Sequence, residues 1–518
     1  SVPFGAAAFP TVPDGFCAVV IGAGVGGLCA AVNLRAAGIP YVVLERNDTV
    51  GGTWLENSYP GAGVDTPNHL YSFSFAPFEW RRYFSLRDEL HNYLEHVSRE
   101  FEVRPNIRFG CEVVSATYNE ADQSWSVDYR DPSGAEQQVT ANLLISAVGA
   151  FNPPRPPDIP GLEGFTGDCY HTARWPADAE LDGRRVGVIG TGASAMQLVP
   201  QIADRVAELT IFQRSPQWAA PFEQFRKEVP EPVQFLLNEV PLYRIWYRMR
   251  LGWTFNDRIH PALQKDPEWE HPERAVNAQN DAFRRFFTRY IQDQLGDRTD
   301  LMDAVLPTYP PYGKRILLDN GWFAAVRRDN VTLVPEAAAS VTGNRVRTAS
   351  GGEHDLDVLI LATGFDVSRF VSTYEVRGRS GQTLRDAWND DDGRAYLGCT
   401  VPGFPNFFVL YGPNLQGGHG GSLMFFLEAQ MTYVMGLVRR MVDDGIGAIE
   451  LRQQICESYN ARLDELHESM IWTHPGMETY YRNTKGRVVV PTPLRVIDFW
   501  GLTRRAELEH YEVESATV

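Results

Sequence analysis

A strand, glycine turn, helix and strand pattern occurs twice in this chain, at 16–46 and 184–215, and it limits the folds that the chain can adopt. In each copy a short apolar run leads into a glycine-rich turn, and apolar residues at helical spacing follow it. Such a βαβ unit places a helix N-terminus where it can bind the pyrophosphate of a dinucleotide. The chain has 518 residues, more than one ordinary core accommodates. We therefore predict an α/β fold with two Rossmann-like dinucleotide-binding domains.

The first glycine turn has the features of an FAD or NAD site. Gly22, Gly24 and Gly27 permit a tight turn and a close approach to the pyrophosphate. Glu45 ends the next predicted strand, at the spacing where a carboxylate binds the ribose hydroxyls of a nucleotide without a 2′-phosphate. If this glycine turn were incidental, the strand before it, the helix after it, the glycine spacing and the acid would all have to agree by chance.

The second glycine turn predicts an NADP site. It consists of Gly190, Thr191, Gly192, Ala193 and Ser194, and the strand after its helix ends at Arg214, where the first unit has its acid. An arginine there suits a 2′-phosphate, although Arg214 could also be an ordinary solvated surface residue. An acid-type and an arginine-type unit in one chain predict FAD that is reduced by NADPH.

The cysteines and the charge exclude several functional classes. The six cysteines form no C-x-x-C pair, so a disulfide reductase is excluded and oxygen becomes the expected electron acceptor. The net charge of −17 argues against nucleic acid or an anionic membrane surface as the main partner. Neither a membrane span, nor a secretory signal, nor a metal site is predicted, and we expect a cytoplasmic protein.

Two segments have features that also occur in hydrolases. Ser194 follows a strand at a turn, and "GHGGS" at 418–422 has the composition of an oxyanion loop. Ser194 is not in a G-x-S-x-G context, and the nucleotide turn already explains it. We expect His419 to be a turn residue or a residue at the edge of the flavin.

Residues 165–176 carry a specific pattern, with Phe165, Gly167, His171, Trp175 and Pro176 at its fixed positions. The pattern resembles the fingerprint of type I Baeyer–Villiger monooxygenases, which are class B flavoprotein monooxygenases. Related enzymes that oxygenate amines and sulfides usually have an aromatic and a basic residue where Trp175 and Pro176 stand. A second pattern of the same family is matched by Gly51, Gly52, Trp54, Tyr59, Pro60, Gly61 and Asp65. The segments 310–323 and 472–500 are most similar to the hydroxyacetophenone monooxygenase branch.

The resemblance implies roles for individual residues. Arg315 is similar to the active-site arginine of the family, and Asp65 to the carboxylate that orients it. Lys314 and Arg214 correspond to the pair that binds the 2′-phosphate of NADP, and Tyr480 to an aromatic residue near the nicotinamide. Besides the first glycine turn and Glu45, the implied FAD contacts are Gly52, Thr53, Trp54 and Asp65.

The fingerprint residues are implied to act through conformation. His171 resembles a hinge residue that couples NADPH binding to closure, and we expect Trp175 to pack. One position departs from the pattern: many members have an arginine two residues before the aspartate, whereas this chain has Gly63.

The resemblance implies that parts of the FAD-binding domain and parts of the NADP-binding domain alternate along the chain. The expected parts are the FAD-binding domain at 1–152 and 376–518, the NADP-binding domain at 153–221 and 307–375, and a helical insertion at 222–306. The insertion is rich in aromatic residues and arginine at helical spacing, and 152–161 is a proline-rich linker. We expect 125–131 and 141–151 to be meander strands, and 396–414 to be a pair of strands.

The reaction implied by the resemblance uses NADPH, FAD and O2 to insert one oxygen atom beside a ketone carbonyl, giving an ester or lactone. A fixed cation such as Arg315 suits this chemistry, because it favours negatively charged oxygen. The aromatic-rich insertion and C-terminal loop suggest apolar aryl or cyclic ketones, with thioethers as further substrates. The alternatives are a flavin monooxygenase acting on sulfides or amines, and a catalytically silent flavin-binding protein.

Overall fold

The structure, a computed structural model, describes residues 8–9, 11–418 and 420–517. His419 and the first seven residues therefore lie outside the described part of the chain, as does any expectation placed on them. Two five-stranded parallel sheets form the framework, and each contains one of the glycine turns.

The first sheet is built around the strand that leads into the first glycine turn. That strand is buried along its whole length, as expected for a parallel sheet covered on both faces. The order in the sheet is β19 (Phe407–Val409), β7 (Leu143–Ser146), β1 (Ala18–Ile21), β2 (Tyr41–Leu44) and β3 (Ile107–Arg108).

The second sheet repeats this arrangement, with the strand before the second glycine turn again in the centre. Its order is β13 (Val331–Val334), β10 (Glu208–Phe212), β9 (Arg185–Ile189), β17 (Val358–Leu361) and β8 (Asp168–His171). All neighbouring strands are parallel in both sheets. Two Rossmann-like cores are thus confirmed.

Four smaller sheets complete the strand content of the described residues. They are β18 (Glu375–Arg377) with β4 (Glu112–Asn119), β5 (Ser124–Arg130) and β6 (Glu136–Ala141); β14 (Ala338–Thr342) with β15 (Arg345–Thr348) and β16 (Glu353–Asp355); β11 (Ala219–Ala220) with β12 (Leu317–Leu318); and β20 (Ile446–Leu451) with β21 (Tyr511–Ser515).

Two sequence-based expectations need correction here. The segment 125–131 does belong to a meander, but β7, within 141–151, is a parallel strand of the first core. The segment 396–414 contributes only one strand, β19, because the residues around it form turns that approach the cleft.

The helices cover the sheets and form the insertion. The first two begin beside the FAD-type turn; α1 (Val25–Ala37) starts after Gly24 and ends at Gly38, which has the left-handed conformation. The others are α2 (Thr53–Glu56), α3 (Arg87–Glu100), α4 (Ala193–Ile202), α5 (Glu231–Glu239), α6 (Tyr243–Phe255), α7 (Ala278–Leu295), α8 (Met302–Val305), α9 (Trp322–Val326), α10 (Leu384–Ala387), α11 (Leu423–Asp444), α12 (Gln453–Glu468) and α13 (Val496–Thr503).

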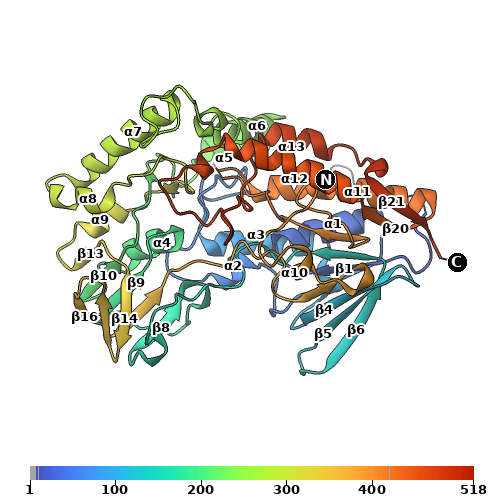
Figure 1. Cartoon of the computed structure of the whole chain (residues 1–518), viewed down its shortest axis with the longest axis horizontal. Coiled ribbons are helices and arrows are strands. Elements are labelled where there is room, and N and C mark those ends of the chain that lie inside the picture. Colours follow the sequence, from blue (N-terminus) through green and yellow to red (C-terminus); the bar gives the residue numbers. More distant parts are fainter. Residues whose placement is uncertain (1–7, 10, 419, 518) are drawn as a thin grey trace.

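Figure 1 shows how these layers are placed. The second core lies on the left and the first core with its meander on the right, while α5 to α8 and α11 to α13 lie along the top. The insertion is helical, as its spacing predicted. In the described part of the chain, no helix has both the length and the apolar character needed to cross a membrane.

Candidate active site

A large cleft lies where the carboxyl ends of the strands of both cores meet. Its volume is about 1140 Å³, and both glycine turns line it. An ordinary small-molecule pocket has roughly 300–1,000 Å³, so this cleft has room for more than one ligand. Ligands of open α/β sheets bind at this end of the strands, where the chain crosses from one strand to the next.

The first glycine turn forms a cradle that only glycine permits. Gly22 has φ = +95°, and a Cβ there would lie 2.7 Å from the carbonyl oxygen of Ala147. A Cβ at Gly27 would overlap the Gly22 carbonyl oxygen, so the helix packs directly against its own turn. Gly27 supports the turn from outside the cleft, whereas Gly22 and Gly24 line it. The backbone is therefore free to approach a pyrophosphate.

Glu45 lines the cleft and also holds this turn in place. One carboxylate oxygen accepts a hydrogen bond from Ala23 N at 2.6 Å, and the other accepts one from Asn47 N at 2.8 Å. Burial raises the pKa of Glu45, and these two backbone donors oppose that effect. A carboxylate has lone pairs beyond those two bonds, which fits the ribose hydroxyls of FAD.

The segment that carries Gly52, Thr53 and Trp54 forms the facing wall. A Cβ at Gly24 would lie 3.3 Å from the Cα of Gly52, so the two glycine backbones face each other closely. Trp54 is buried and donates from Nε1 to the hydroxyl of Tyr71 at 3.1 Å. These residues line the cleft and fit a flat, extended dinucleotide such as FAD.

The second glycine turn repeats the geometry of the first. Gly190 has φ = +108°, and a Cβ there would lie 2.5 Å from the Ala362 carbonyl oxygen, just as Gly22 lies against Ala147. All five predicted residues of this turn line the cleft, namely Gly190, Thr191, Gly192, Ala193 and Ser194. Ser194 belongs to α4 beside the nucleotide turn, in agreement with our rejection of a hydrolase.

Two cations stand at the end of this turn. The side chain of Arg214 is 79% exposed and its nearest acid is Glu478, at 4.0 Å. Lys314 donates from Nζ to Ser215 Oγ at 3.0 Å and lies over the ring of Tyr309. Burial, with Arg214 nearby, lowers the pKa of Lys314 to about 8. A pair of cations that repel each other beside a hydroxyl fits the 2′-phosphate of NADP.

Arg315 and Asp65 meet inside the cleft, although 250 positions separate them in the chain. Arg315 donates to the two oxygens of Asp65, from Nη2 at 2.8 Å and from Nε at 3.3 Å. Its Nη1 donates to the Gly417 carbonyl oxygen at 3.2 Å. Burial alone would lower the pKa of Arg315, but Asp65 and the nearby tyrosines raise it above its usual value. The guanidinium is therefore a permanent, oriented cation.

An aromatic wall surrounds this cation. Tyr71, Tyr411 and Tyr480 line the cleft and lie within electrostatic range of Arg315. The hydroxyl of Tyr480 accepts from Gln416 Nε2 at 3.4 Å, and its ring meets Tyr481 edge to face. No described residue of 222–304 lines the cleft, so the aromatic residues of the insertion are not its wall.

Arg226 lies behind the cleft wall, beside the loop that carries Asp65, and the motifs did not identify it. Its guanidinium fills the space beside Gly63, where an added Cβ would lie 2.3 Å from Nη1 of Arg226. Nη2 donates to the Gly61 carbonyl oxygen at 3.1 Å, while Nη1 is buried without a hydrogen-bond partner. Burial lowers the pKa of Arg226 to about 10, whereas Tyr59 and Asp65 act to raise it. A cation from the insertion thus lies beside Gly63, the position at which the pattern has an arginine.

The fingerprint residues do not line the cleft. Phe165, Gly167, His171, Trp175 and Pro176 lie on and around β8, at the edge of the second core. A Cβ at Gly167 would lie 2.3 Å from the Asp357 carbonyl oxygen, and Trp175 packs edge to face on Tyr170.

His171 is buried beside the linker. Its Nδ1 accepts from Ala173 N at 3.1 Å, and its ring packs against Phe365, which in turn packs against Phe151. Burial lowers the pKa of His171, which favours the neutral ring. Its position fits a packing or hinge role rather than proton transfer at the cleft.

Comparisons with known proteins agree with this geometry. A family model described as pyridine nucleotide-disulphide oxidoreductase matches residues 19–240, which hold both glycine turns. The chain is 48% identical over 501 residues to an uncharacterized monooxygenase of Sinorhizobium fredii, spanning 97% of this chain and 76% of that protein.

Two further similarities extend over nearly the whole chain. A Baeyer–Villiger monooxygenase of Streptomyces coelicolor is 36% identical over 497 residues, which cover 95% of this chain and 92% of that protein. A crystal structure of OTEMO in complex with FAD and NADP has a TM-score of 0.84 at 27% identity, covering 97% of this chain and 100% of that one.

Proposed function

The chain belongs to the Baeyer–Villiger monooxygenase family, and we propose from this premise that it oxygenates apolar aryl or cyclic ketones in the cleft beside Arg315. Its activity is that of an NADPH-dependent flavoprotein monooxygenase, which uses FAD and O2 to insert one oxygen atom beside a ketone carbonyl. The ketone itself is the part that we propose.

FAD, when bound, supplies the hydride-accepting and oxygen-activating chemistry. The first glycine turn, Glu45 and the wall from Gly52 to Trp54 would hold it, because they form a cradle without side chains that ends at a carboxylate. The second glycine turn with Arg214 and Lys314 would hold NADP, whose 2′-phosphate would offset the repulsion between the two cations. We assign Tyr480 to the nicotinamide half on the strength of its place in the wall.

The observation that carries the proposal is the paired Arg315 and Asp65. Asp65 occupies two donors of the guanidinium and the Gly417 carbonyl oxygen takes a third, so the orientation of the cation is set by the protein. A fixed cation lowers the energy of negative charge on oxygen without reorganising at the moment of reaction. Arg315 would keep the attacking oxygen anionic and would stabilise the charge that develops on the ketone oxygen.

The substrate class follows from the surroundings of that cation. Trp54, Tyr71, Tyr411 and Tyr480 present rings, and Leu423 adds an aliphatic side chain to the lining. Such a wall favours an apolar body with a single polar oxygen directed at the guanidinium. Aryl ketones also accord with the likeness of 310–323 and 472–500 to the hydroxyacetophenone branch.

The other assignments concern organisation and location. We propose the domain division given above, with the FAD-binding parts around the first sheet and the NADP-binding parts around the second. We also propose that the protein works in the reducing cytoplasm, which its six free cysteines support.

The test is a product analysis of the FAD-loaded enzyme with NADPH, air and matched panels of aryl ketones, cyclic ketones, thioethers and amines. Esters or lactones from the ketones support the proposal. Sulfoxides or N-oxides without any ester would refute it in favour of a sulfide or amine oxygenase. Flavin reduction without any organic product would indicate the silent flavoprotein instead.

A further inference from the structure

The helix α6 of the insertion has an apolar stripe that faces solvent. Leu242, at its start, and Ile245, Trp246, Met249 and Trp253 recur at spacings of three and four residues, so they share one face. These five side chains are between 52% and 75% exposed. Large apolar side chains gathered on one face, rather than scattered singly, mark an interaction surface.

This outward stripe is separate from the apolar face that α6 needs in order to fold. The inward face carries Tyr247 and is continued by Leu251 and Phe255, which pack in one cluster with Tyr83 and Phe84. Core packing therefore explains one side of the helix and leaves the other side unexplained. α6 also contributes nothing to the lining of the cleft, so substrate binding does not explain the stripe either.

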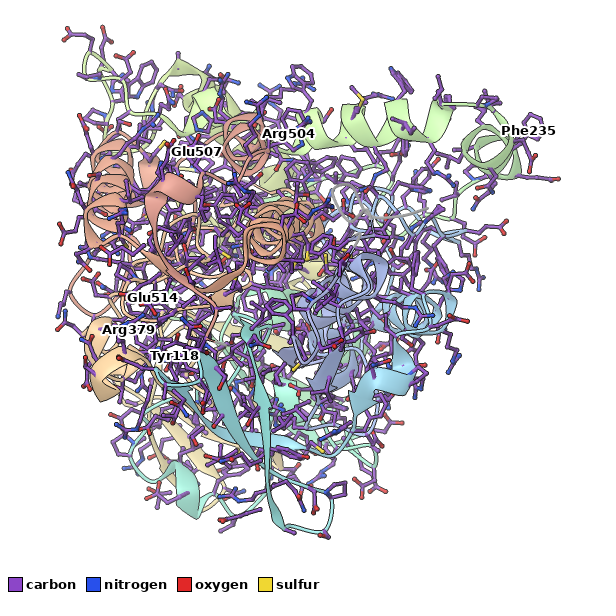
Figure 2. The ribbon with its side chains drawn as sticks, turned by 90° about the vertical axis from the view of Figure 1, so that its right-hand side faces the viewer. Tyr118, Phe235, Arg379, Arg504, Glu507 and Glu514 are labelled. Carbon is purple, nitrogen blue, oxygen red and sulfur yellow. The ribbon has the colours of Figure 1, made fainter. Side chains whose placement is uncertain are left out.

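The surface continues onto α13. Asp257, just after α6, accepts hydrogen bonds from the backbone N–H groups of Val496 and Ile497 at 2.8 and 3.3 Å, which ties the two helices together. α13 exposes three more apolar side chains, Ile497, Trp500 and Leu502, and α5 exposes Phe235. Figure 2 shows Phe235 and Arg504 on the same upper edge of the molecule, with a helix of the insertion between them. We call the exposed apolar residues of α5, α6 and α13 the apolar edge.

Arginines accompany each exposed tryptophan of the apolar edge. Arg250 lies over the ring of Trp246 at 5.8 Å, Arg258 over Trp253 at 5.8 Å, and Arg504 over Trp500 at 4.7 Å. Tryptophan and arginine side chains combine an apolar body with a polar or charged end. They are therefore suited to the boundary between lipid tails and headgroups.

The charge of the apolar edge is opposite to that of the whole chain. α6 contains no acid and three arginines, of which Arg248 is bonded inward to His69 and Ser72, whereas the net charge of the protein is −17. Two of the acids on these helices are already engaged, because Asp257 caps α13 and Asp498 pairs with Arg495. Glu231 and Glu239 stand at the two ends of α5. A concentration of cations around an apolar stripe is complementary to anionic headgroups.

We propose that the apolar edge docks the enzyme on the surface of an anionic lipid bilayer, with α6 lying in the plane of the interface. The net charge of the chain argued against such a partner, but docking depends on the charge of the face that meets the membrane. Two copies meeting through this face would place arginines against arginines, which disfavours a symmetric dimer as the occupant. Apolar ketones partition into bilayers, so docking would raise their concentration near the enzyme; this last benefit rests on the proposed function.

The experiment measures flotation of the full-length, FAD-loaded enzyme with vesicles. The vesicles contain phosphatidylcholine alone or with phosphatidylglycerol. We expect binding to the anionic vesicles, weakened by high salt, and at least about tenfold weaker binding to phosphatidylcholine alone. The combined variant Trp246→Ser, Met249→Ser, Trp253→Ser should lose this binding by about tenfold or more. Its turnover of a water-soluble ketone should match that of the parent enzyme.

Two further variants keep the test decisive. Val114→Ser with Val513→Ser removes exposed apolar side chains elsewhere and should bind vesicles like the parent. Arg505 is an exposed arginine just after α13. Arg250→Glu with Arg505→Glu reverses charge while keeping every apolar side chain of the stripe, and it should abolish the preference for anionic vesicles. Failure of the parent enzyme to bind anionic vesicles would overturn the proposal. If that enzyme also sedimented as a dimer that the triple variant dissociates, the apolar edge would be an interface between copies.

Discussion

Arg315 and Asp65, which are 250 positions apart in the sequence, are joined inside the cleft by two hydrogen bonds of 2.8 and 3.3 Å. The third contact of the guanidinium, to Gly417, leaves its remaining N–H groups for ligands. Asp65 accepts only from the Nε and Nη2 edge of the guanidinium. It therefore orients the cation and leaves the other edge of the guanidinium able to interact with a ligand.

Arg315→Ala should separate NADPH oxidation from oxygenation. The variant should bind FAD and consume NADPH, because flavin reduction does not require this cation. Ester formation should fall by about a hundredfold or more, since a charge-assisted contact is worth roughly 1.5–3 kcal/mol and at least two such contacts are lost. Hydrogen peroxide should account for the missing product. Arg315→Lys should recover little, because lysine lacks the planar fork. A ratio of ester to NADPH near that of the parent enzyme would reduce Arg315 to a structural partner of Asp65.

Arg214→Ala and Lys314→Ala should each raise KM for NADPH far more than they change kcat. Losing one charge-assisted contact to the 2′-phosphate corresponds to roughly tenfold to a hundredfold in KM. KM for NADH should hardly change. The matched control is Arg345→Ala, an exposed arginine on β15 that pairs with acids away from the cleft. Equal use of NADH and NADPH by the parent enzyme would rule out the assignment.

The pH dependence of NADPH binding should report on Lys314. Its pKa of about 8 lies below the usual lysine value because the ammonium is buried beside Arg214. The cation that meets the phosphate is therefore present below pH 8 and is lost as the pH rises above it. KM for NADPH should rise across this range, while Lys314→Arg should keep it flat because arginine stays protonated. Steady-state kinetics between about pH 7 and 10 measure this. An unchanged pH profile in Lys314→Arg would show that another group titrates.

His171→Gln should slow flavin reduction by NADPH while leaving FAD bound. Glutamine can still accept from Ala173 N, but it loses the ring that packs on Phe365. If the role is closure, both limbs of the pH–rate profile should persist in the variant. Stopped-flow reduction and a pH–rate profile test this together, and the loss of one limb would reveal an acid–base role.

Gly63→Ala should disturb the active site through Arg226. The new methyl group would lie 2.3 Å from Nη1 of Arg226 and 2.7 Å from the Ser85 carbonyl oxygen, so the guanidinium must move. We expect destabilisation by about 1–3 kcal/mol, together with a lower ester yield per NADPH. Gly164→Ala is the matched control, because a Cβ there meets open space. Arg226→Ala, which leaves the Ser85 carbonyl oxygen undisturbed, should lower the ester yield in the same way; a loss of thermal stability alone would make Arg226 merely structural.

The sequence predicted those parts of the site that depend on local spacing. Each glycine turn lies within about 25 residues of its partner, Glu45 or Arg214, inside one βαβ unit, so sequence spacing alone is enough to predict them. The strand β7 was misassigned, because a fully buried run of four residues has no periodicity that separates a core strand from a meander strand.

Contacts between residues that are far apart in the sequence could not be predicted from such patterns. Arg226 comes from the insertion and meets Gly61 and Gly63 more than 160 positions away, so no motif contains it. From the sequence, the aromatic residues of α6 suggest an apolar substrate site, because periodicity cannot distinguish an apolar helix face that is turned inward from one that is turned to solvent. Only the structure shows that the two faces of this helix differ in what covers them.

The loop that holds Asp65 is also bonded to the other nucleotide-binding core. Gln197, on α4, donates to the Gly63 carbonyl oxygen at 2.8 Å and accepts from the Tyr59 hydroxyl at 2.7 Å. The same helix begins at the second glycine turn, so whatever displaces it on binding there also displaces the loop of Asp65. In thermodynamic terms the two cofactor affinities are linked: the factor by which FAD changes the affinity for NADP equals the factor by which NADP changes the affinity for FAD. A titration of either nucleotide, with and without the other, therefore measures one and the same coupling free energy.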